Sequence, residues 1–374
     1  MKAALQIDQL WFRQPGGIGT YVRELADALA ATGALELSLF HCRFTEDGPD
    51  PAWLGRFPIE EVPGPIRTLY PQWSLLGRPK LPPAFGAFDV VHATNPVSVP
   101  PVRKGSALAV TVHDLAHHRF PDRFPPRWRF LYGAGVRAAV KRADALLVPS
   151  NATADDLIAI AGADPMKVHV TPLAVRAIGG TSDGEETRAR LGVTAPYVLF
   201  VGTLEPRKNV VKLVRAYRQV APDVPHALVL AGPDGWHTED LEEELAREGP
   251  GTVIRTGSVS DDDLDALYRG ASAFAYPSTF EGFGLPVLEA MARGVPTVTS
   301  DAPALAEVAA GAALLVEPDD VAGLADALAR MLTDETLATD LRSRGLARAA
   351  GYTWAATARA TLEVYRLVAG ATPA

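Results

Sequence analysis

The sequence predicts an α/β protein made of two Rossmann-like halves, each a parallel sheet covered by helices. Short, continuous apolar runs alternate with helical patterns along almost the whole chain, which is typical of parallel strands buried on both faces. The alternation is broken by a polar, glycine-rich stretch, residues 176–188, which we interpret as an interdomain linker. A chain of 374 residues is also long enough for two domains.

The first half begins with a strand and an amphipathic helix. We expect strands at apolar runs in residues 3–7, 35–40, 89–94, 108–114 and 145–150. We expect the helix at residues 19–33, ending at Gly33. Residues 45–86 are rich in proline and lack clear periodicity, so we predict a long loop region or an insertion there.

The second half repeats the alternation. The expected strands are residues 197–202, 226–232, 252–257, 273–278, 296–300 and 312–318. The expected helices between them are residues 209–220, 241–248, 261–270 and 286–294. The last helix, residues 353–370, could close on either half.

Composition excludes several classes of protein. A net charge of −8 and a pI of about 5.5 argue against bulk binding of nucleic acid, which needs a basic surface. The single cysteine, Cys42, excludes an internal disulfide and fits a reducing compartment. Gln6 and Asp8 interrupt the N-terminal apolar run, and no stretch approaches the ~20 apolar residues that span a membrane. We therefore expect a cytoplasmic protein.

The glycine-rich stretch 14–21 follows the first strand. Ligands of open parallel sheets bind beyond the carboxyl ends of the strands, and two such halves that face each other would form a cleft. Gly16 and Gly17 would let the backbone approach a substrate or phosphate at the start of a helix. A tight turn without a ligand is the alternative. Binding of a nicotinamide dinucleotide is weakly supported, because Gly17 and Gly19 are followed by Val22 where the fingerprint needs a third glycine.

A histidine follows the expected strand 108–114 at its carboxyl end. His113 is in position to be an active-site residue, and Asp114 could orient its imidazole. A structural histidine is the alternative. A metal site with His117 and His118 has little support, because no cysteine or glutamate ligands accompany them.

Two cations stand between a strand and a helix at residues 201–209. Arg207 and Lys208 precede Asn209, a good N-cap residue, and would repel each other beside a positive helix end unless an anion neutralises them. A diphosphate would do this, since arginine forks onto oxygen atoms and lysine supplies a point charge. A solvated, charged loop is the alternative.

Two glutamates flank the start of the expected helix 286–294. Gly282 and Gly284 would expose backbone N–H groups there, with Pro286 as the first helical residue. Glu281 would lie in the loop and Glu289 about one turn into the helix, apart from each other along a ligand. Glu289 could accept two hydrogen bonds from a vicinal diol such as a ribose, and Glu281 could meet a bound sugar. A surface acid and a helix-dipole acid are the alternative.

These motifs together resemble the retaining glycosyltransferases of family 4. The resemblance is carried by residues 205–209 and by 277–301, in which Glu281 and Glu289 match the family's E-x7-E motif. It covers nearly the whole chain, with counterparts in order at residues 14–25, 111–121, 148–157 and 312–320. The residue pattern of segment 111–121 most resembles that of bacterial mannosyl- and rhamnosyltransferases. At 171–178, Ala174 and Arg176 depart from the asparagine- or glycine-rich turn of many relatives.

The resemblance implies a GT-B fold, with two Rossmann-like domains whose parallel sheets face a central cleft. It implies an N-terminal acceptor-side domain of residues 1–178 plus 353–374, completed by the C-terminal crossover helix, and a C-terminal nucleotide-sugar-binding domain of residues 188–352. No cofactor or metal is implied, because protein cations replace magnesium.

The resemblance also implies roles for individual residues. Arg207 and Lys208 would hold the diphosphate of the donor, and Glu289 its ribose. The sugar would be held by Glu281 and by the backbone of Gly282, Phe283, Gly284 and Leu285. His113 would lie beside the transferred sugar, with Gly16 and Gly17 near the phosphate and the acceptor. The catalytic set is therefore His113, Arg207, Lys208 and Glu281.

We therefore predict a hexosyltransferase that retains anomeric configuration. It would use a GDP-, UDP- or dTDP-linked sugar, mannose-like by preference, and a saccharide or small-molecule acceptor. A sugar-nucleotide epimerase or hydrolase on the same fold, and a non-catalytic binding subunit, are the alternatives. Residues 123–142 interleave arginine and lysine with aromatic residues, so peripheral contact with the inner face of a membrane is a separate hypothesis.

Overall fold

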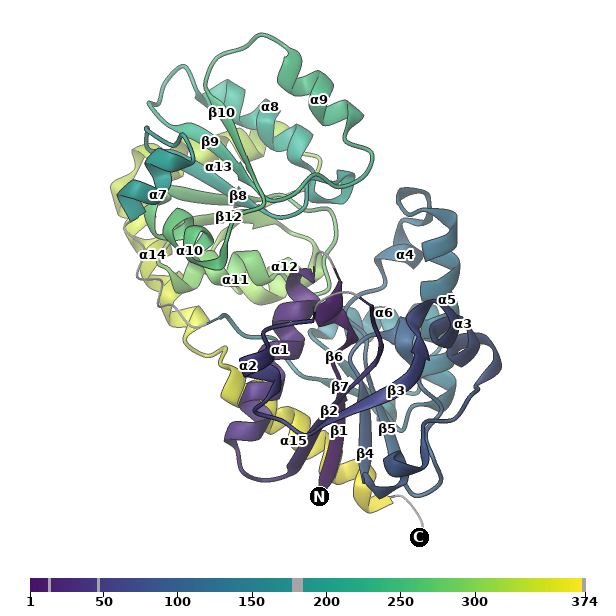
Figure 1. Ribbon diagram of the computed structural model, residues 1–374. Helices are drawn as coiled ribbons and strands as arrows, with labels where there is room; N and C mark the ends of the chain where they lie inside the picture. Colours follow the sequence, from purple (N-terminus) through teal and green to yellow (C-terminus); the bar gives the residue numbers. More distant parts are fainter. Residues whose placement is uncertain (13–14, 46–47, 177–183, 372–374) are drawn as a thin grey trace. The chain divides into compact units, whose positions relative to one another are not determined.

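The computed structural model describes residues 1–12, 15–45, 48–176 and 184–371. They form two compact units, which we call the N-terminal unit (Met1–Ala174 with Thr353–Ala374) and the C-terminal unit (Val175–Tyr352). Each unit is a parallel sheet with helices on its faces (Figure 1). Residues 177–183 of the predicted linker lie outside the described residues. The linker prediction is wrong for its end, because helix α7 (Gly184–Arg190) begins there, with acids in its first turn and arginines in its last.

The sheet of the N-terminal unit holds all five predicted strands and two more. Its order in the described residues is β3 (Ile59–Pro65), β2 (Glu36–Arg43), β1 (Lys2–Gln6), β4 (Val90–Ala93), β5 (Ala107–Thr111), β6 (Ala145–Val148) and β7 (Val168–Val170). Its α-helices are α1 (Gly16–Ala31), α2 (Pro51–Leu54), α3 (Ile66–Leu76), α4 (Ala116–Arg119), α5 (Pro126–Arg142), α6 (Asn151–Ala161) and α15 (Trp354–Ala371). Strands β2 and β3 extend the sheet on one side of β1, and β4 to β7 extend it on the other side. The strand order therefore reverses between the parallel neighbours β1 and β4.

The prediction of a long loop at residues 45–86 is wrong. This segment contains β3 and α3, which extend the sheet and cover it. Strand β3 lies at the sheet edge and buries only Val62, and α3 buries only Leu69 and Trp73. So few inward residues, with Pro71 inside the helix, do not produce the periodicity from which elements are predicted.

Helix α1 begins earlier than predicted. Gly16 and Gly17 belong to its first turn, not to a loop before it. Gly16 has a φ of +59°, a conformation that side chains disfavour. A Cβ at Gly19 would lie 2.3 Å from the Cβ of Pro15, so this glycine is needed for packing at the helix start.

The C-terminal unit matches its predicted elements closely. Its sheet order is β10 (Val253–Gly257), β9 (Ala227–Ala231), β8 (Tyr197–Val201), β11 (Ala273–Tyr276), β12 (Thr297–Ser300) and β13 (Leu314–Val316). The α-helices after α7 are α8 (Val210–Val220), α9 (Glu239–Ala246), α10 (Asp261–Gly270), α11 (Leu285–Ala292), α12 (Pro303–Ala309), α13 (Val321–Thr333) and α14 (Glu335–Ala349). Here the strand order reverses between β8 and β11.

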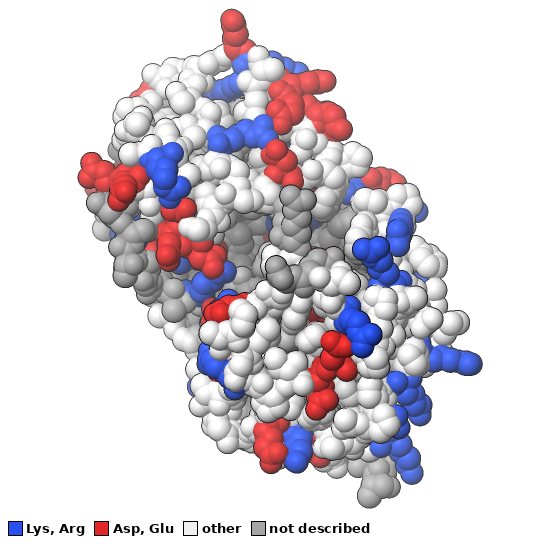
Figure 2. Space-filling view, viewed as in Figure 1, with Lys and Arg blue, Asp and Glu red and all other residues white. Residues whose placement is uncertain are grey.

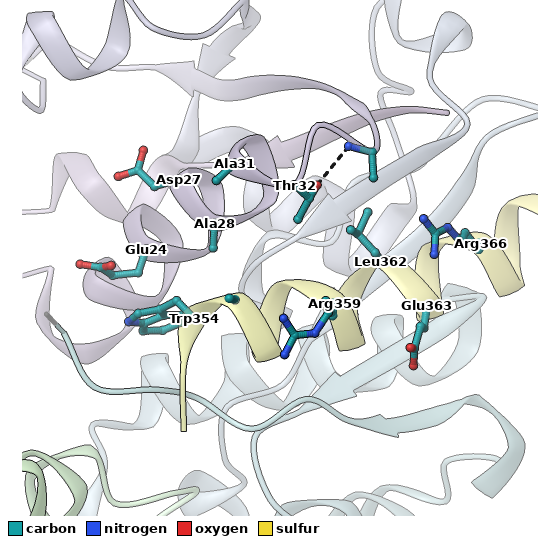
Figure 3. A pocket seen from close by; sticks show the side chains of 12 residues that line it. Glu24, Asp27, Ala28, Ala31, Thr32, Trp354, Arg359, Leu362, Glu363 and Arg366 are labelled. Carbon is teal, nitrogen blue, oxygen red and sulfur yellow. Dashed lines mark hydrogen bonds between the residues drawn. The ribbon is translucent and has the colours of Figure 1, made fainter. Parts of the chain in front are cut away.

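Helix α15 completes the N-terminal unit from the far end of the sequence. It packs against α1, and a groove of about 790 Å³ runs between the two helices. Figure 3 shows Ala28 and Ala31 of α1 across the groove from Trp354, Arg359 and Leu362 of α15. Beneath it, Tyr365 reaches the buried His92 of β4 (hydroxyl to Nδ1, 2.6 Å). The helix is thereby tied to the core of the sheet.

Candidate active site

The two cations of the C-terminal unit and Glu281 meet at one edge of its sheet. Strands β8 and β11 are parallel neighbours, so the segments that follow them leave from the same edge. Arg207 and Lys208 lie in a short 3-10 turn (Pro206–Lys208) after β8, and Glu281 lies in the loop after β11. This is the point where the strand order reverses, the usual ligand site of open parallel sheets.

Glu281 binds both cations. Its Oε2 accepts a hydrogen bond from Arg207 Nη1 at 3.0 Å, and its Oε1 accepts one from Lys208 Nζ at 2.6 Å. The loop also binds the backbone of the turn, because Thr279 N donates to Arg207 O at 2.8 Å and Arg207 Nη1 donates to Phe280 O at 2.8 Å. The two motifs therefore form one cluster.

Three residues that sequence analysis did not assign complete this ion cluster. Glu205 accepts a hydrogen bond from Arg207 Nη2 at 2.7 Å. Tyr276 and Ser278 donate hydroxyl hydrogen bonds to Glu281 Oε1 at 3.1 and 2.6 Å. Their positions in the sequence could have indicated these roles. Glu205 comes two residues before Arg207, and Tyr276 and Ser278 lie at the end of the buried strand β11.

The cluster holds its charges away from water. The Glu281 and Lys208 side chains are each only 11% exposed. Burial alone would raise the pKa of Glu281, but Arg207, Lys208 and the hydrogen bonds bring it down to about 2. Burial, followed by the charge of Arg207, lowers the pKa of Lys208. Glu281 is therefore a carboxylate at neutral pH.

The prediction that an external anion must neutralise Arg207 and Lys208 is wrong, because Glu205 and Glu281 already neutralise the two cations. Asn209 also differs from its predicted role. It precedes α8 with a φ of 61°, and its side chain donates to Pro277 O and Pro318 O instead of capping the helix. It thus fastens the turn to neighbouring loops.

The glycines at the start of α11 fit a closely packed backbone. Gly284 is the N-cap residue, with a φ of +114°, and a Cβ there would lie 2.5 Å from Leu305 Cδ2. Pro286 is the second helical residue, one later than predicted. The Phe283 side chain is buried edge-on against Tyr352, with ring centroids 5.8 Å apart. Phe283 therefore offers only its backbone to a ligand.

Glu289 lies on α11 with a different set of partners. Its Oε2 accepts a hydrogen bond from Tyr268 OH at 3.0 Å, and burial raises its pKa against the opposing charges of Arg293 and Arg176. Arg176, at the departure from the family pattern, pairs with Asp261. Glu281 and Glu289 thus have separate partners and do not form a carboxylate pair. The sequence also predicts that they lie apart.

His113 follows β5 in the N-terminal unit. Its Nε2 lies 2.9 Å from Thr94 O, and because a carbonyl can only accept, Nε2 carries the proton. Burial lowers its pKa despite this bond and the charge of Asp114. The neutral ring therefore has an accepting Nδ1. The predicted orienting role of Asp114 is wrong, because its carboxylate accepts from Ala116 N and Thr94 fixes the ring.

A buried hydrogen-bond chain lies behind His113. The Tyr21 ring packs edge-on against His113 at 5.0 Å, and its hydroxyl is 2.8 Å from Thr111 Oγ1. Thr111 Oγ1 is in turn 2.7 Å from Nε2 of His92, whose pKa burial lowers to about 3. Single-sequence patterns do not reveal such a chain, since it joins α1, β4, β5 and α15.

The structure brings together only part of the predicted site within each unit. Arg207, Lys208 and Glu281 share one cluster, and Gly282 to Leu285 continue from it to Glu289. Gly16, Gly17 and His113 belong to the N-terminal unit. In the described ranges, no group of three or more His, Cys, Asp or Glu side chains is arranged to hold a metal ion.

Comparison with protein families identifies the class. Residues 183–348 match the model described as "Glycosyl transferases group 1", and residues 15–178 match "Glycosyltransferase Family 4". A D-inositol 3-phosphate glycosyltransferase of Kineococcus radiotolerans is 31% identical over 94% of this chain and 90% of that protein. Both family models describe glycosyltransferases, and each matches one of the two parallel-sheet units. The chain belongs to glycosyltransferase family 4.

Other relatives agree with this class. The O-antigen chain mannosyltransferase B of Escherichia coli is 38% identical over 46% of this chain. The matched region spans 46% of that protein, and 34% of the serotype-specific mannosyltransferase WbdA, which is 30% identical over 71% of this chain. The predicted enzyme class, a hexosyltransferase, is confirmed.

Solved structures confirm the fold class. Sucrose-phosphate synthase from Thermosynechococcus elongatus has a TM-score of 0.75 at 22% identity and covers 99% of this chain and 100% of its own. Anabaena HepE in complex with UDP and glucose has a TM-score of 0.74 at 19% identity, covering 98% and 100%. The α/β prediction of GT-B type is therefore confirmed.

Proposed function

We propose that this chain is a retaining glycosyltransferase that moves a hexose, mannose by preference, from a nucleoside-diphosphate sugar to an acceptor hydroxyl. The acceptor is a hydroxyl of a glycan, a lipid-linked saccharide or a natural product. The observation that carries the proposal is the ion cluster of Glu205, Arg207, Lys208 and Glu281 at the strand-order reversal. The mannosyltransferase relatives support mannose, and the HepE complex with UDP and glucose supports a nucleotide sugar.

In this proposal the donor lies along the loop that joins the cluster to α11. Arg207 and Lys208 hold the diphosphate, and Glu289 holds the ribose. The sugar is held by Glu281 and the backbone of residues 282–285. The diphosphate then replaces part of the charge that Glu281 supplies in the free protein, so Glu281 can turn its oxygen atoms toward sugar hydroxyls.

The reaction breaks the bond between the anomeric carbon and the diphosphate oxygen. Negative charge develops on the departing diphosphate, and the preorganised cations Arg207 and Lys208 stabilise it. The acceptor oxygen forms the new bond on the same face of the sugar, and its proton passes to the departing phosphate. No metal or cofactor is needed in this scheme, because the protein supplies the positive charge.

His113 is proposed to act as a hydrogen-bond acceptor for the transferred sugar. The contact with Thr94 fixes the proton on Nε2, which leaves the Nδ1 lone pair for a sugar hydroxyl. Tyr21 and the chain behind it hold the ring in this orientation. Gly16 and Gly17 remain assigned to the phosphate and acceptor side, now as first-turn helical residues.

A nucleotide panel tests the donor site. We expect one of GDP, UDP, dTDP and ADP to raise the thermal stability clearly, because a ligand at 100 times its dissociation constant adds ~2.7 kcal/mol. Glu289→Ala should weaken that shift by removing the ribose acceptor, whereas Glu243→Ala, an exposed acid on α9, should leave it unchanged. If none of the four nucleotides shifts the unfolding temperature, the proposed donor site is wrong.

Membrane contact through residues 123–142 is a further part of the proposal. Trp128 and Phe130 of α5 are 51% and 55% exposed, and Arg127, Arg129 and Lys141 lie exposed on the same helix. Figure 2 shows Lys and Arg side chains along the edge of the N-terminal unit where Figure 1 places α3 and α5. Across the described ranges, no helix has the length and apolar character that crossing a membrane requires.

Vesicle sedimentation tests this contact. We expect the protein to sediment at low salt with vesicles that contain phosphatidylserine and not with phosphatidylcholine alone, because basic and aromatic residues favour an anionic interface. Trp128→Ala should weaken sedimentation several-fold. Trp236→Ala, at a 37% exposed tryptophan of the C-terminal unit, is the matched control. Equal sedimentation of both variants, or none with the wild type, contradicts membrane contact.

A further inference from the structure

A second pocket lies in the N-terminal unit, where α4 and the following 3-10 turn (Pro121–Arg123) meet α5. Its volume is about 340 Å³, at the small end of the range for ligand pockets. Its polar lining consists of His117, His118, Arg129 and Arg137, and we call it the histidine–arginine pocket. Pro121, Pro126, Phe130 and Gly133 form the rest of its wall.

The lining carries positive charge and contains no acidic side chain. The Arg137 side chain makes no hydrogen bond or ion pair with the described residues. Burial, and to a lesser degree the charge of Arg137, lowers the pKa of both histidines. Of the acids outside the lining, Asp156 pairs with Arg119, whereas Asp114 accepts a hydrogen bond from Ala116 N and its negative charge acts on His117. An anion entering the pocket would therefore meet two arginine side chains and no carboxylate within the lining itself.

His117 also needs a partner. It is 4% exposed, and its Nε2 has no hydrogen-bond partner among the described residues. Burying such a group unsatisfied costs about 1–3 kcal/mol, so native structures usually supply a partner. The rings of His117 and His118 lie 4.4 Å apart, which places two imidazoles on the same wall.

Two donor nitrogen atoms of the pocket lie beside Gly133. An added Cβ at Gly133 would lie 3.5 Å from Arg137 Nη1 and 4.0 Å from His118 Nε2. The two nitrogen atoms thus converge over a residue without a side chain. Two guanidinium groups and two imidazoles offer more donors than a carboxylate can use, and they suit a group with three or four oxygen atoms.

We propose that the histidine–arginine pocket binds the phosphoryl group of a phosphorylated ligand. His117 lies only four residues after His113 in the chain, at the same end of β5. The ligand is then a phosphorylated acceptor, held by its phosphate while a hydroxyl elsewhere receives the sugar. This identification with the acceptor rests on the proposed function, whereas binding of a phosphoryl group does not.

Titration of inorganic phosphate into the full chain tests the pocket. The imidazole NMR signals of His117 and His118, identified with His117→Gln and His118→Gln, are followed with the donor site filled by the nucleotide that binds it. We expect both signals to shift saturably. Arg137→Gln should raise the dissociation constant by about 10-fold or more, since a hydrogen bond to a charged group is removed.

Arg366→Gln is the matched control, because Arg366 is an exposed arginine of α15 that lines neither the pocket nor the proposed membrane contact. Circular dichroism checks that both variants are folded. Signals of His117 and His118 that do not respond to phosphate, or equal binding by the two variants, would overturn the proposal. Phosphate binding that persists in a chain without glycosyl transfer would leave the pocket in place and remove only its link to the acceptor.

Vesicles distinguish the two sources of the phosphoryl group. Phosphatidic acid carries a phosphate monoester at a membrane surface, and phosphatidylserine at the same surface charge does not. If Arg137→Gln weakens sedimentation with phosphatidic acid more than Arg366→Gln does, the ligand is a lipid phosphate. If vesicle binding is equal in both variants while inorganic phosphate binding depends on Arg137, the ligand is a soluble phosphate ester.

Discussion

Replacing Arg207 with alanine is expected to lower turnover by ~100-fold or more, because it removes a preorganised donor from the departing diphosphate. The guanidinium also connects Glu205 to Glu281, so its loss leaves two acids facing the donor phosphates. The measurement is the rate at which the nucleoside diphosphate is released from the donor that the nucleotide panel selects.

Two controls make the Arg207 result specific. Arg330→Ala removes an arginine whose side chain is 55% exposed on α13 and should leave turnover unchanged. Arg207→Lys keeps the charge but loses the fork that reaches Glu205 and Glu281 together, so it should recover only part of the rate. Near-normal turnover of Arg207→Ala would remove Arg207 from the proposed mechanism.

Glu281→Gln is expected to reduce stability at neutral pH by about 3 kcal/mol, because it leaves Arg207 and Lys208 partly buried without their shared carboxylate. The effect has a defined pH dependence. The pKa of Glu281 is about 2, below its ordinary value of 4.5. The carboxylate therefore contributes its full stabilisation above pH 4.5, and this contribution is lost as the pH falls toward 2.

Thermal unfolding at a series of pH values measures this. The difference between wild type and Glu281→Gln should be greatest above pH 4.5 and shrink toward pH 2. Glu243→Gln, an exposed acid on α9, is the matched control and should follow the wild type. A difference that does not change with pH would mean that the ion cluster does not stabilise the fold through the charge of Glu281.

The same variant separates two roles of Glu281. Without the carboxylate, Arg207 and Lys208 lose one competing anion, while Glu205 still pairs with Arg207, so the nucleoside diphosphate should bind more tightly to Glu281→Gln than to the wild type. Turnover should nevertheless fall, because the sugar loses a hydrogen-bond acceptor. Weaker binding of the nucleotide would show instead that Glu281 serves mainly to position the two cations.

The location of Arg207, Lys208 and Glu281 at one edge of the sheet could be predicted from sequence because it follows from chain connectivity. Arg207, Lys208 and Glu281 each come just after a continuous apolar run, and the ends of parallel strands lie at one sheet edge. The direction in which Glu281 points could not be predicted in this way. Whether its carboxylate faces a ligand or folds back onto the cations depends on distances between loops, which spacing along the chain does not determine.

Other features were hidden for different physical reasons. Strand β3 lies at a sheet edge and buries a single residue, so its pattern is too weak to detect. Thr94 orients His113 through its backbone carbonyl, and because every residue has such a carbonyl, the residue type gives no indication of this role. The histidine–arginine pocket joins α4 to α5, and its histidines were considered only as metal ligands in the sequence.

The attachment of α15 has a consequence for the order in which the chain can fold during synthesis. The N-terminal unit lacks its last helix until the ribosome has translated all of the C-terminal unit, Val175–Tyr352. Until then His92 has no Tyr365 hydroxyl, and the apolar flank of α1 is uncovered. A nascent chain released before residue 353 would thus carry a complete C-terminal unit and an N-terminal unit without its last helix, so we expect such a truncated product to expose apolar surface of α1.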